Sequence, residues 1–213
     1  MTLEHAGIVA SDRCRPVVEL QQMISPIQNR YCRALLIAAA LMLIACTTAA
    51  QEAAKPKWTT PSGFEVIGIE ARTNNTQEST GSGAIPKQWQ RLFMENLLGR
   101  IPDRLDQSIV AVYSNYASDW NGDYTYTLGA KVKPGTKAPE GMVAKNIPTG
   151  KYAEFTSKRG RPELVVPEMW KDVWAYFQAP GSPTRAYGTD YEIYDDLSDP
   201  TNVQVKLYVG VIP

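Results

Sequence analysis

The chain has 213 residues, enough for one domain of ordinary size and a smaller segment, and its 22 Lys+Arg balance its 22 Asp+Glu. Balanced charge without a basic cluster argues against nucleic acid as a partner. The single histidine, His5, and the cysteines, Cys14, Cys32 and Cys46, all lie in the first 46 residues. The rest of the chain therefore lacks the side chains for a Ser-His-Asp triad, a Cys-His nucleophile or a His/Cys zinc site, and we expect no metal and no cofactor.

Residues 1–46 have the pattern of a leader with a lipoprotein-type signal. Arg30 and Arg33 precede an uninterrupted small and apolar run at 34–45. This run is too short to cross a bilayer core of about 30 Å as a helix, but it suits the apolar region of a signal peptide. The run ends in LIAC (43–46), which resembles the bacterial lipobox, in which the cysteine is lipidated and becomes the new N-terminus. We expect lipidation at Cys46, export, and anchoring to the membrane on the periplasmic or cell-envelope side.

Two alternatives to lipidation remain open: a secretory signal cut after Ala50, or a buried helix over the same apolar run. Met23 would give a signal of more ordinary length, so residues 1–22 are a candidate start-site overextension that is not translated. Residues 47–61 are small, polar and interrupted by proline, which predicts a flexible tether.

The domain that follows, 62–213, is predicted to begin with a β-α-β-β half at 62–133. Alternating apolar residues predict a strand at 64–71, and 72–83 is polar and predicted to be a loop. A helix begins at Ile85-Pro86 and ends at Gly99. Two β-rich runs, joined by a turn containing Asn-Gly, follow at the positions 109–116 and 124–132.

A second half with the same plan is predicted at 142–213, after a linker at 134–141. The expected elements are two strands, one helix and two further strands, at 142–147, 151–157, 164–177, 189–194 and 203–211. The helix sequence IPKQWQRLF (85–93) recurs as VPEMWKDVW (166–174), with the prolines and the first tryptophans in register. We therefore predict an α+β fold: a duplicated β-α-β-β unit with pseudo-two-fold symmetry, antiparallel sheets and two long helices around a central pocket.

The two halves differ in charge at one strand position. Val112-Tyr113 recurs as Ile193-Tyr194, but Ala111 of the first half is replaced by Glu192 in the second. Strand alternation places Glu192 and Tyr194 on one face and Tyr191 and Ile193 on the other. A glutamate among aromatic residues would favour a ligand with positive charge or would stay protonated. The alternative is a solvated sheet face, with the tryptophans as plain core.

Several short segments of the domain form an ordered set: VYSNY (112–116), GDYTY (122–126), IPTGKYAEF (147–155), WKDVW (170–174) and RAYGTDYEIYD (185–195). This set resembles the GyrI-like effector-binding domain of the SOUL/GyrI-like superfamily. Such domains form the ligand-sensing part of AraC- and MerR-type regulators and also occur alone. The resemblance covers about 62–212 and implies the duplicated fold with an aromatic pocket.

The resemblance also implies the site residues. Glu192 matches the glutamate that contacts cationic ligands in that family, and the neighbouring aromatic positions correspond to Tyr113, Trp170 and Tyr208. Because a leader stands where the regulators carry a DNA-binding module, we expect a stand-alone, membrane-anchored domain that binds small aromatic or cationic organic ligands without catalysis. Two alternatives remain: a hydrolase of small electrophilic molecules with Glu192 as general base, and a protein-interaction module of the envelope.

Overall fold

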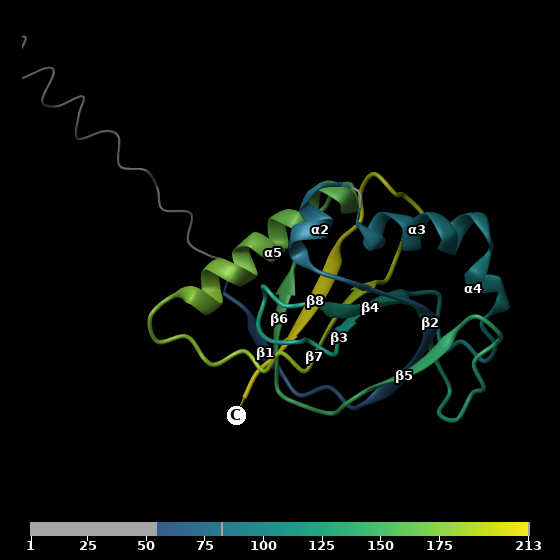
Figure 1. Ribbon diagram of the computed structural model, residues 1–213, viewed down its shortest axis with the longest axis horizontal. Coiled ribbons are helices and arrows are strands. Elements are labelled where there is room, and N and C mark those ends of the chain that lie inside the picture. The colour runs from purple at the N-terminus through teal and green to yellow at the C-terminus, as the bar shows by residue number, and fades with distance from the viewer. Residues whose placement is uncertain (1–54, 82, 213) are drawn as a thin grey trace, which may run out of the picture. The chain divides into compact units, whose positions relative to one another are not determined.

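One antiparallel sheet of eight strands forms the centre of the structure (Figure 1). The computed structural model describes residues 55–81 and 83–212. The strand order is β1-β6-β8-β7-β3-β4-β2-β5. The bounds are β1 Lys57–Thr59, β2 Phe64–Thr73, β3 Ile109–Ser114, β4 Tyr124–Val132, β5 Val143–Ile147, β6 Tyr152–Thr156, β7 Thr189–Tyr194 and β8 Val205–Gly210.

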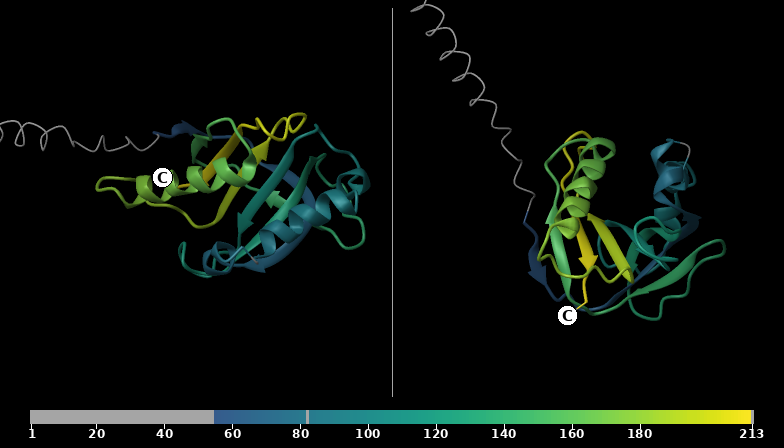
Figure 2. Two further views of the ribbon diagram at one scale, coloured as in Figure 1. Left: turned by 90° about the horizontal axis from the view of Figure 1, so that it is seen from above. Right: turned by 60° about the vertical axis from the view of Figure 1, so that its left-hand side comes forward.

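The helices lie over one face of this sheet. They are α2 Asn75–Ser79, α3 Ala84–Met94, α4 Leu97–Arg100 and α5 Pro162–Gln178. Figure 2 shows α5 and α3 above the curved sheet and apart from one another, each over the strands of its own half. Within the described residues, no helix has both the length and the apolar character needed to cross a membrane.

The predicted duplication is confirmed, and the two halves meet at the middle of the sheet. The first half contributes β2, α3, β3 and β4, and the second contributes β6, α5, β7 and β8. The central strands β3 and β7 pair antiparallel, with Ala111 directly opposite Glu192 and Ile109 opposite Tyr194. Because Ala111 and Glu192 are also equivalent in the repeat, the pseudo-two-fold axis passes between them.

The edge strands connect the two halves. β5, from the segment assigned to the second half, pairs with β2 of the first half, and β1 pairs with β6 of the second half. The sheet therefore begins at Lys57, inside the segment predicted as the tether 47–61. A three-residue strand such as KWT is too short to show the alternation from which strands are predicted. The predicted leader 1–46, Cys46 and most of the tether lie outside the described residues.

Two local predictions in the first half were wrong. The segment 72–83, predicted as a loop, extends β2 to Thr73 and then forms α2, whose N-cap Asn74 accepts a hydrogen bond from the Gln77 backbone N–H at 2.9 Å. The predicted helix from Ile85 to Gly99 is broken into α3 and α4. Asn96, with φ of 48°, adopts the left-handed conformation that asparagine tolerates better than most residues.

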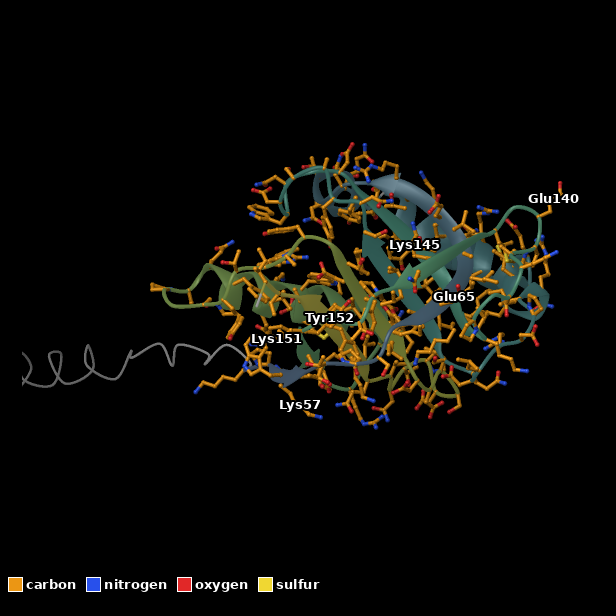
Figure 3. The ribbon with its side chains drawn as sticks, turned by 90° about the horizontal axis from the view of Figure 1, so that it is seen from below. Lys57, Glu65, Glu140, Lys145, Lys151 and Tyr152 are labelled. Carbon is orange, nitrogen blue, oxygen red and sulfur yellow. The ribbon has the colours of Figure 1, made fainter. Side chains whose placement is uncertain are left out.

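The two faces of the sheet have different surroundings, as strand alternation predicts. Tyr194 belongs to the large core beneath the helices, whereas Tyr191 and Ile193 belong to a smaller cluster on the opposite face. Figure 3 looks onto the side away from the helices, where Glu65 and Lys145 are among the charged side chains. The fold therefore directs the carboxylate of Glu192, which has the same parity as Tyr194, toward the helices.

Candidate ligand-binding site

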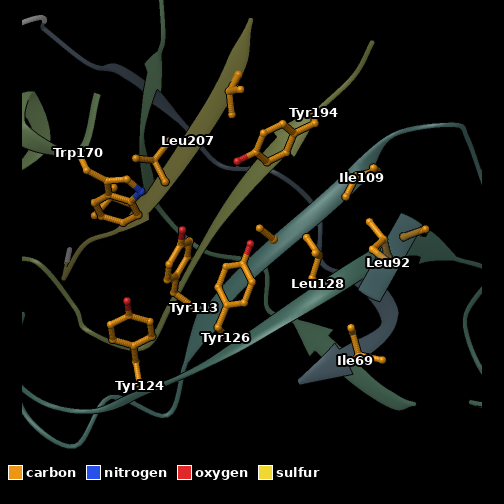
Figure 4. Packing of buried hydrophobic residues seen from close by; sticks show 14 of the residues in the cluster. Ile69, Leu92, Ile109, Tyr113, Tyr124, Tyr126, Leu128, Trp170, Tyr194 and Leu207 are labelled. Atoms are coloured by element: carbon orange, nitrogen blue, oxygen red, sulfur yellow. The ribbon is translucent and has the colours of Figure 1, made fainter. Parts of the chain in front are cut away.

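A cavity of about 1160 Å³ lies between α3 and α5, above the central strands. Its wall is largely aromatic. The helices contribute tryptophans and the strands contribute tyrosines, chiefly Trp89, Trp170, Trp174, Tyr113, Tyr126 and Tyr194. Figure 4 shows the hydroxyls of Tyr113, Tyr126 and Tyr194 and the indole nitrogen of Trp170 turned toward the same central region. The cavity thus has apolar walls with polar groups that converge at its centre, as small-molecule sites usually do.

The carboxylate of Glu192 lies at that centre and is only 1% exposed. Its Oε1 accepts hydrogen bonds from Tyr113 Oη at 2.9 Å and from Trp170 Nε1 at 2.7 Å, and its Oε2 accepts one from Tyr194 Oη at 2.8 Å. All three donors are neutral. None of the ion pairs formed by the described residues includes Glu192.

Burial raises the pKa of Glu192 above the ordinary value of glutamate, and the three hydrogen bonds from Trp170, Tyr194 and Tyr113 offset part of this effect. Burial also raises the pKa of Tyr113 and Tyr194 well above the ordinary value of tyrosine, so both hydroxyls remain protonated and serve as donors. A desolvated carboxylate without a cationic partner is costly, and a positive charge placed beside it would remove much of that cost. The site is therefore suited to a cation.

The strand register explains why Glu192 reaches the cavity. It occupies the middle of β7, where its neighbours across the strand pairs are Ala111 on β3 and Leu207 on β8. Directly opposite side chains in an antiparallel pair have Cβ atoms about 5 Å apart. A large residue at position 111 would lie against the carboxylate, whereas the methyl group of Ala111 leaves space above it.

The structure brings together three of the four predicted site residues and leaves the fourth outside. Glu192, Tyr113 and Trp170 meet in the cavity, but Tyr208 lies on the opposite face of the sheet. There it is half-buried and stacks on Tyr191, with ring centroids 4.6 Å apart. Position 208 has the opposite parity to Leu207, which faces the helices, so the expectation that Tyr208 lines the pocket is corrected.

A second buried polar cluster in the cavity wall was not predicted. The Arg185 guanidinium donates from Nη2 to Asp190 Oδ2 at 2.6 Å and to Tyr116 Oη at 3.2 Å. Asp190 also accepts from Tyr116 Oη at 2.7 Å and from the Gly210 backbone N–H at 2.8 Å. Strand alternation would have placed Asp190 on the face of Glu192. Its pairing with Arg185, however, depends on a turn at Tyr187, whose φ is 49°.

This fold and this site define a GyrI-like effector-binding domain: a duplicated β-α-β-β unit with an aromatic cavity and one buried glutamate on the strand beside the two-fold axis. The chain belongs to the Cass2 family, described as "Integron-associated effector binding protein", whose model matches residues 59–211. The predicted resemblance is therefore confirmed over almost the whole of the described domain.

Individual proteins agree with this assignment. YobU of Bacillus subtilis (strain 168) is 32% identical over 146 residues, which cover 68% of this chain and 89% of YobU. The integron cassette protein VCH_CASS2 of Vibrio cholerae is 26% identical with a TM-score of 0.61, over 74% of this chain and 96% of that protein. SAV2435, whose structure contains bound tetraphenylphosphonium, is 16% identical with a TM-score of 0.61 over 74% of this chain and 94% of its own, and so shares the fold.

Proposed function

We propose that this protein binds small aromatic organic cations in the cavity between α3 and α5, as an effector-binding domain without catalytic turnover. One observation carries the proposal: Glu192 is buried among aromatic rings, and its three hydrogen-bond donors are all neutral. A bound cation would supply the missing positive charge. The faces of the surrounding rings would add cation–π attraction and apolar contact.

The bound state of a structural neighbour supports this choice of ligand class. SAV2435, which has the same fold, was solved with tetraphenylphosphonium, a cation whose phosphorus atom carries four phenyl groups. A cavity of about 1160 Å³ exceeds the usual volume of small-molecule sites, so a ligand of this bulk is compatible with it. Tetraphenylphosphonium is therefore a suitable first probe.

We extend this proposal to the location of the protein. The leader pattern and the LIAC segment at 43–46 favour export and lipidation of Cys46. Attachment through the lipid would hold the domain at the membrane surface, where lipophilic cations concentrate. A mass measurement of the mature N-terminus tests this part, because a diacylated Cys46 and cleavage after Ala50 give different masses.

The binding proposal is tested by calorimetry with tetraphenylphosphonium on the wild type and on Glu192→Gln. Glutamine has nearly the shape of glutamate but no charge, so we expect at least about tenfold weaker binding, equivalent to roughly 1.4 kcal/mol. Glu154→Gln is the matched control. Glu154 is opposite Tyr208 in the β6–β8 pair, on the far face of the sheet, so we expect the change there to leave affinity unaltered. Equal affinity of Glu192→Gln and wild type, or no binding by the wild type, would contradict the proposal.

A further inference from the structure

Arg185 places a second charged group in the wall of the same cavity. Its side chain is 5% exposed, and it lines the cavity together with Tyr116, Trp170 and Glu192. The guanidinium lies over the rings of Tyr116, Trp170 and Tyr187, with its central carbon 5.6, 5.4 and 4.6 Å from their centroids. The guanidinium is therefore surrounded by aromatic rings.

The charge of Arg185 is compensated within the protein. Asp190, which is fully buried, accepts from the Arg185 guanidinium, from Tyr116 Oη and from the Gly210 backbone N–H. The two buried carboxylates of β7 therefore differ in whether a positive charge of the protein balances them. Asp190 has its own cation, whereas Glu192 has only neutral donors.

The hydrogen-bonding capacity of Arg185 is not exhausted by these contacts. A guanidinium has five N–H donors, and only those on Nη2 reach an acceptor among the described residues. Nε is buried without a hydrogen-bond partner. Nε is closed to a ligand, so the N–H groups of Nη1, which the protein does not enclose, are the donors that an oxygen acceptor in the cavity would reach.

Arg185 and Glu192 line the same cavity and share Trp170 as a neighbour. Asp190, which holds Arg185, and Glu192 are two residues apart on one face of β7, so their backbones are separated by roughly 7 Å. Trp170 connects the two groups, since its Nε1 donates to Glu192 at 2.7 Å and its ring faces the guanidinium. A ligand that lies in the cavity beside Trp170 would have Glu192 near one end and Arg185 near the other.

We propose that Arg185 is a specificity-determining residue that selects organic cations carrying an uncharged oxygen acceptor, such as an ester, amide or ketone carbonyl, a few bonds from the positive centre. This inference rests on the proposed function, because it requires that Glu192 holds the cationic end. The acceptor is uncharged because Asp190 already neutralises Arg185 and a ligand carboxylate would face both Asp190 and Glu192.

The test compares two ligands of nearly equal shape on the full chain: benzoylcholine, which has an ester carbonyl, and (4-phenylbutyl)trimethylammonium, which has methylene groups in place of the ester. We expect the wild type to bind the ester about tenfold more tightly. Arg185→Lys keeps the charge opposite Asp190 but loses the planar set of donors. The ratio of its affinities for the two ligands should therefore fall to near one, while both ligands still bind.

A double variant, Arg185→Met with Asp190→Asn, removes both charges together and serves if Arg185→Lys does not fold. It too is expected to bind both ligands equally. The preference is a ratio measured within one protein, so a general loss of stability does not imitate the effect. Equal binding of the two ligands by the wild type, or a preference kept by Arg185→Lys or the double variant, would overturn the inference. Failure of the proposed function has a different signature, in which neither ligand binds or Glu192→Gln leaves both affinities unchanged.

Discussion

Tyr113 and Tyr194 occupy equivalent positions in the two halves, and their hydroxyls donate to different oxygens of one carboxylate, 2.9 Å to Oε1 and 2.8 Å to Oε2 of Glu192. The pseudo-two-fold axis between Ala111 and Glu192 explains this convergence, because it brings equivalent side chains to the same place. Duplication has thus supplied a symmetric pair of donors around a charge that only one half carries. A glutamate at both positions would set two like charges against each other.

We predict that Tyr113→Phe and Tyr194→Phe each weaken the binding of tetraphenylphosphonium at pH 7 by about three- to tenfold. Each change removes a hydrogen bond that favours the ionised carboxylate, worth on the order of 1 kcal/mol, and keeps the aromatic ring in the wall. The pKa of Glu192 then rises further, and the cation must displace a proton from a larger share of the free protein. Calorimetric titration of both variants measures the effect. Because the two donors are equivalent, the two losses should be similar in size.

Tyr208→Phe is the matched control for this pair. Tyr208 stacks on Tyr191 on the far face of the sheet, so removing its hydroxyl leaves the cavity unchanged, and affinity should equal that of the wild type. If Tyr208→Phe weakens binding as much as the other two variants, the ligand does not sit beside Glu192.

The raised pKa of Glu192 predicts how the stability of the ligand-free protein depends on pH. Burial favours the protonated carboxyl in the folded state, so the folded pKa lies above the unfolded value of about 4.3. The folded protein then binds more protons than the unfolded chain between these two values, and its stability falls as pH rises through the folded pKa. Urea denaturation in steps from pH 4 to pH 8 measures this fall, and in Glu192→Gln the contribution of this residue should be absent.

Binding of tetraphenylphosphonium should change in the opposite direction over the same pH window. The cation interacts with the ionised carboxylate, so affinity rises as Glu192 loses its proton, and binding below the folded pKa releases a proton. Titrations in buffers with different heats of ionisation detect that proton. A wild-type affinity that is flat across the window would show that Glu192 is not the counter-charge.

The sequence was sufficient to predict the elements that depend on local pattern and repetition. The repeat placed Ala111 and Glu192 at equivalent positions, and alternation placed Glu192 with Tyr194 on one face. Both are confirmed by the register of β3 and β7. The prediction that Tyr208 lines the cavity was wrong, and the repeat itself explains why. At the offset that relates Ala111 to Glu192, Tyr126 corresponds to Leu207, and Tyr208 corresponds to Thr127 on the other face.

Other features depend on contacts that no local pattern encodes. The Arg185–Asp190 pair closes across a turn in which Tyr187 takes a positive φ, and nothing in RAYGTD predicts that closure. The pairing of β1 with β6 joins Trp58 to Ala153, far apart in sequence. Such pairings form because they cover the open edge of a sheet. That edge exists only after both halves have assembled, so no local pattern in the sequence indicates the pairing.

The close approach of β2 and β4 provides a test of the sheet that supports Tyr124 and Tyr126. Gly68 and Gly129 are directly opposite each other, and a Cβ at Gly68 would overlap the backbone carbonyl of Leu128. We therefore predict that Gly68→Ala lowers the free energy of unfolding by at least about 2 kcal/mol, since only a backbone shift could relieve the overlap. Gly188→Ala is the control: that glycine has open space where a Cβ would lie, so its change should stay within about 0.5 kcal/mol. Urea midpoints of the two variants compare them directly, and equal stability would mean that β2 and β4 do not pair in this register.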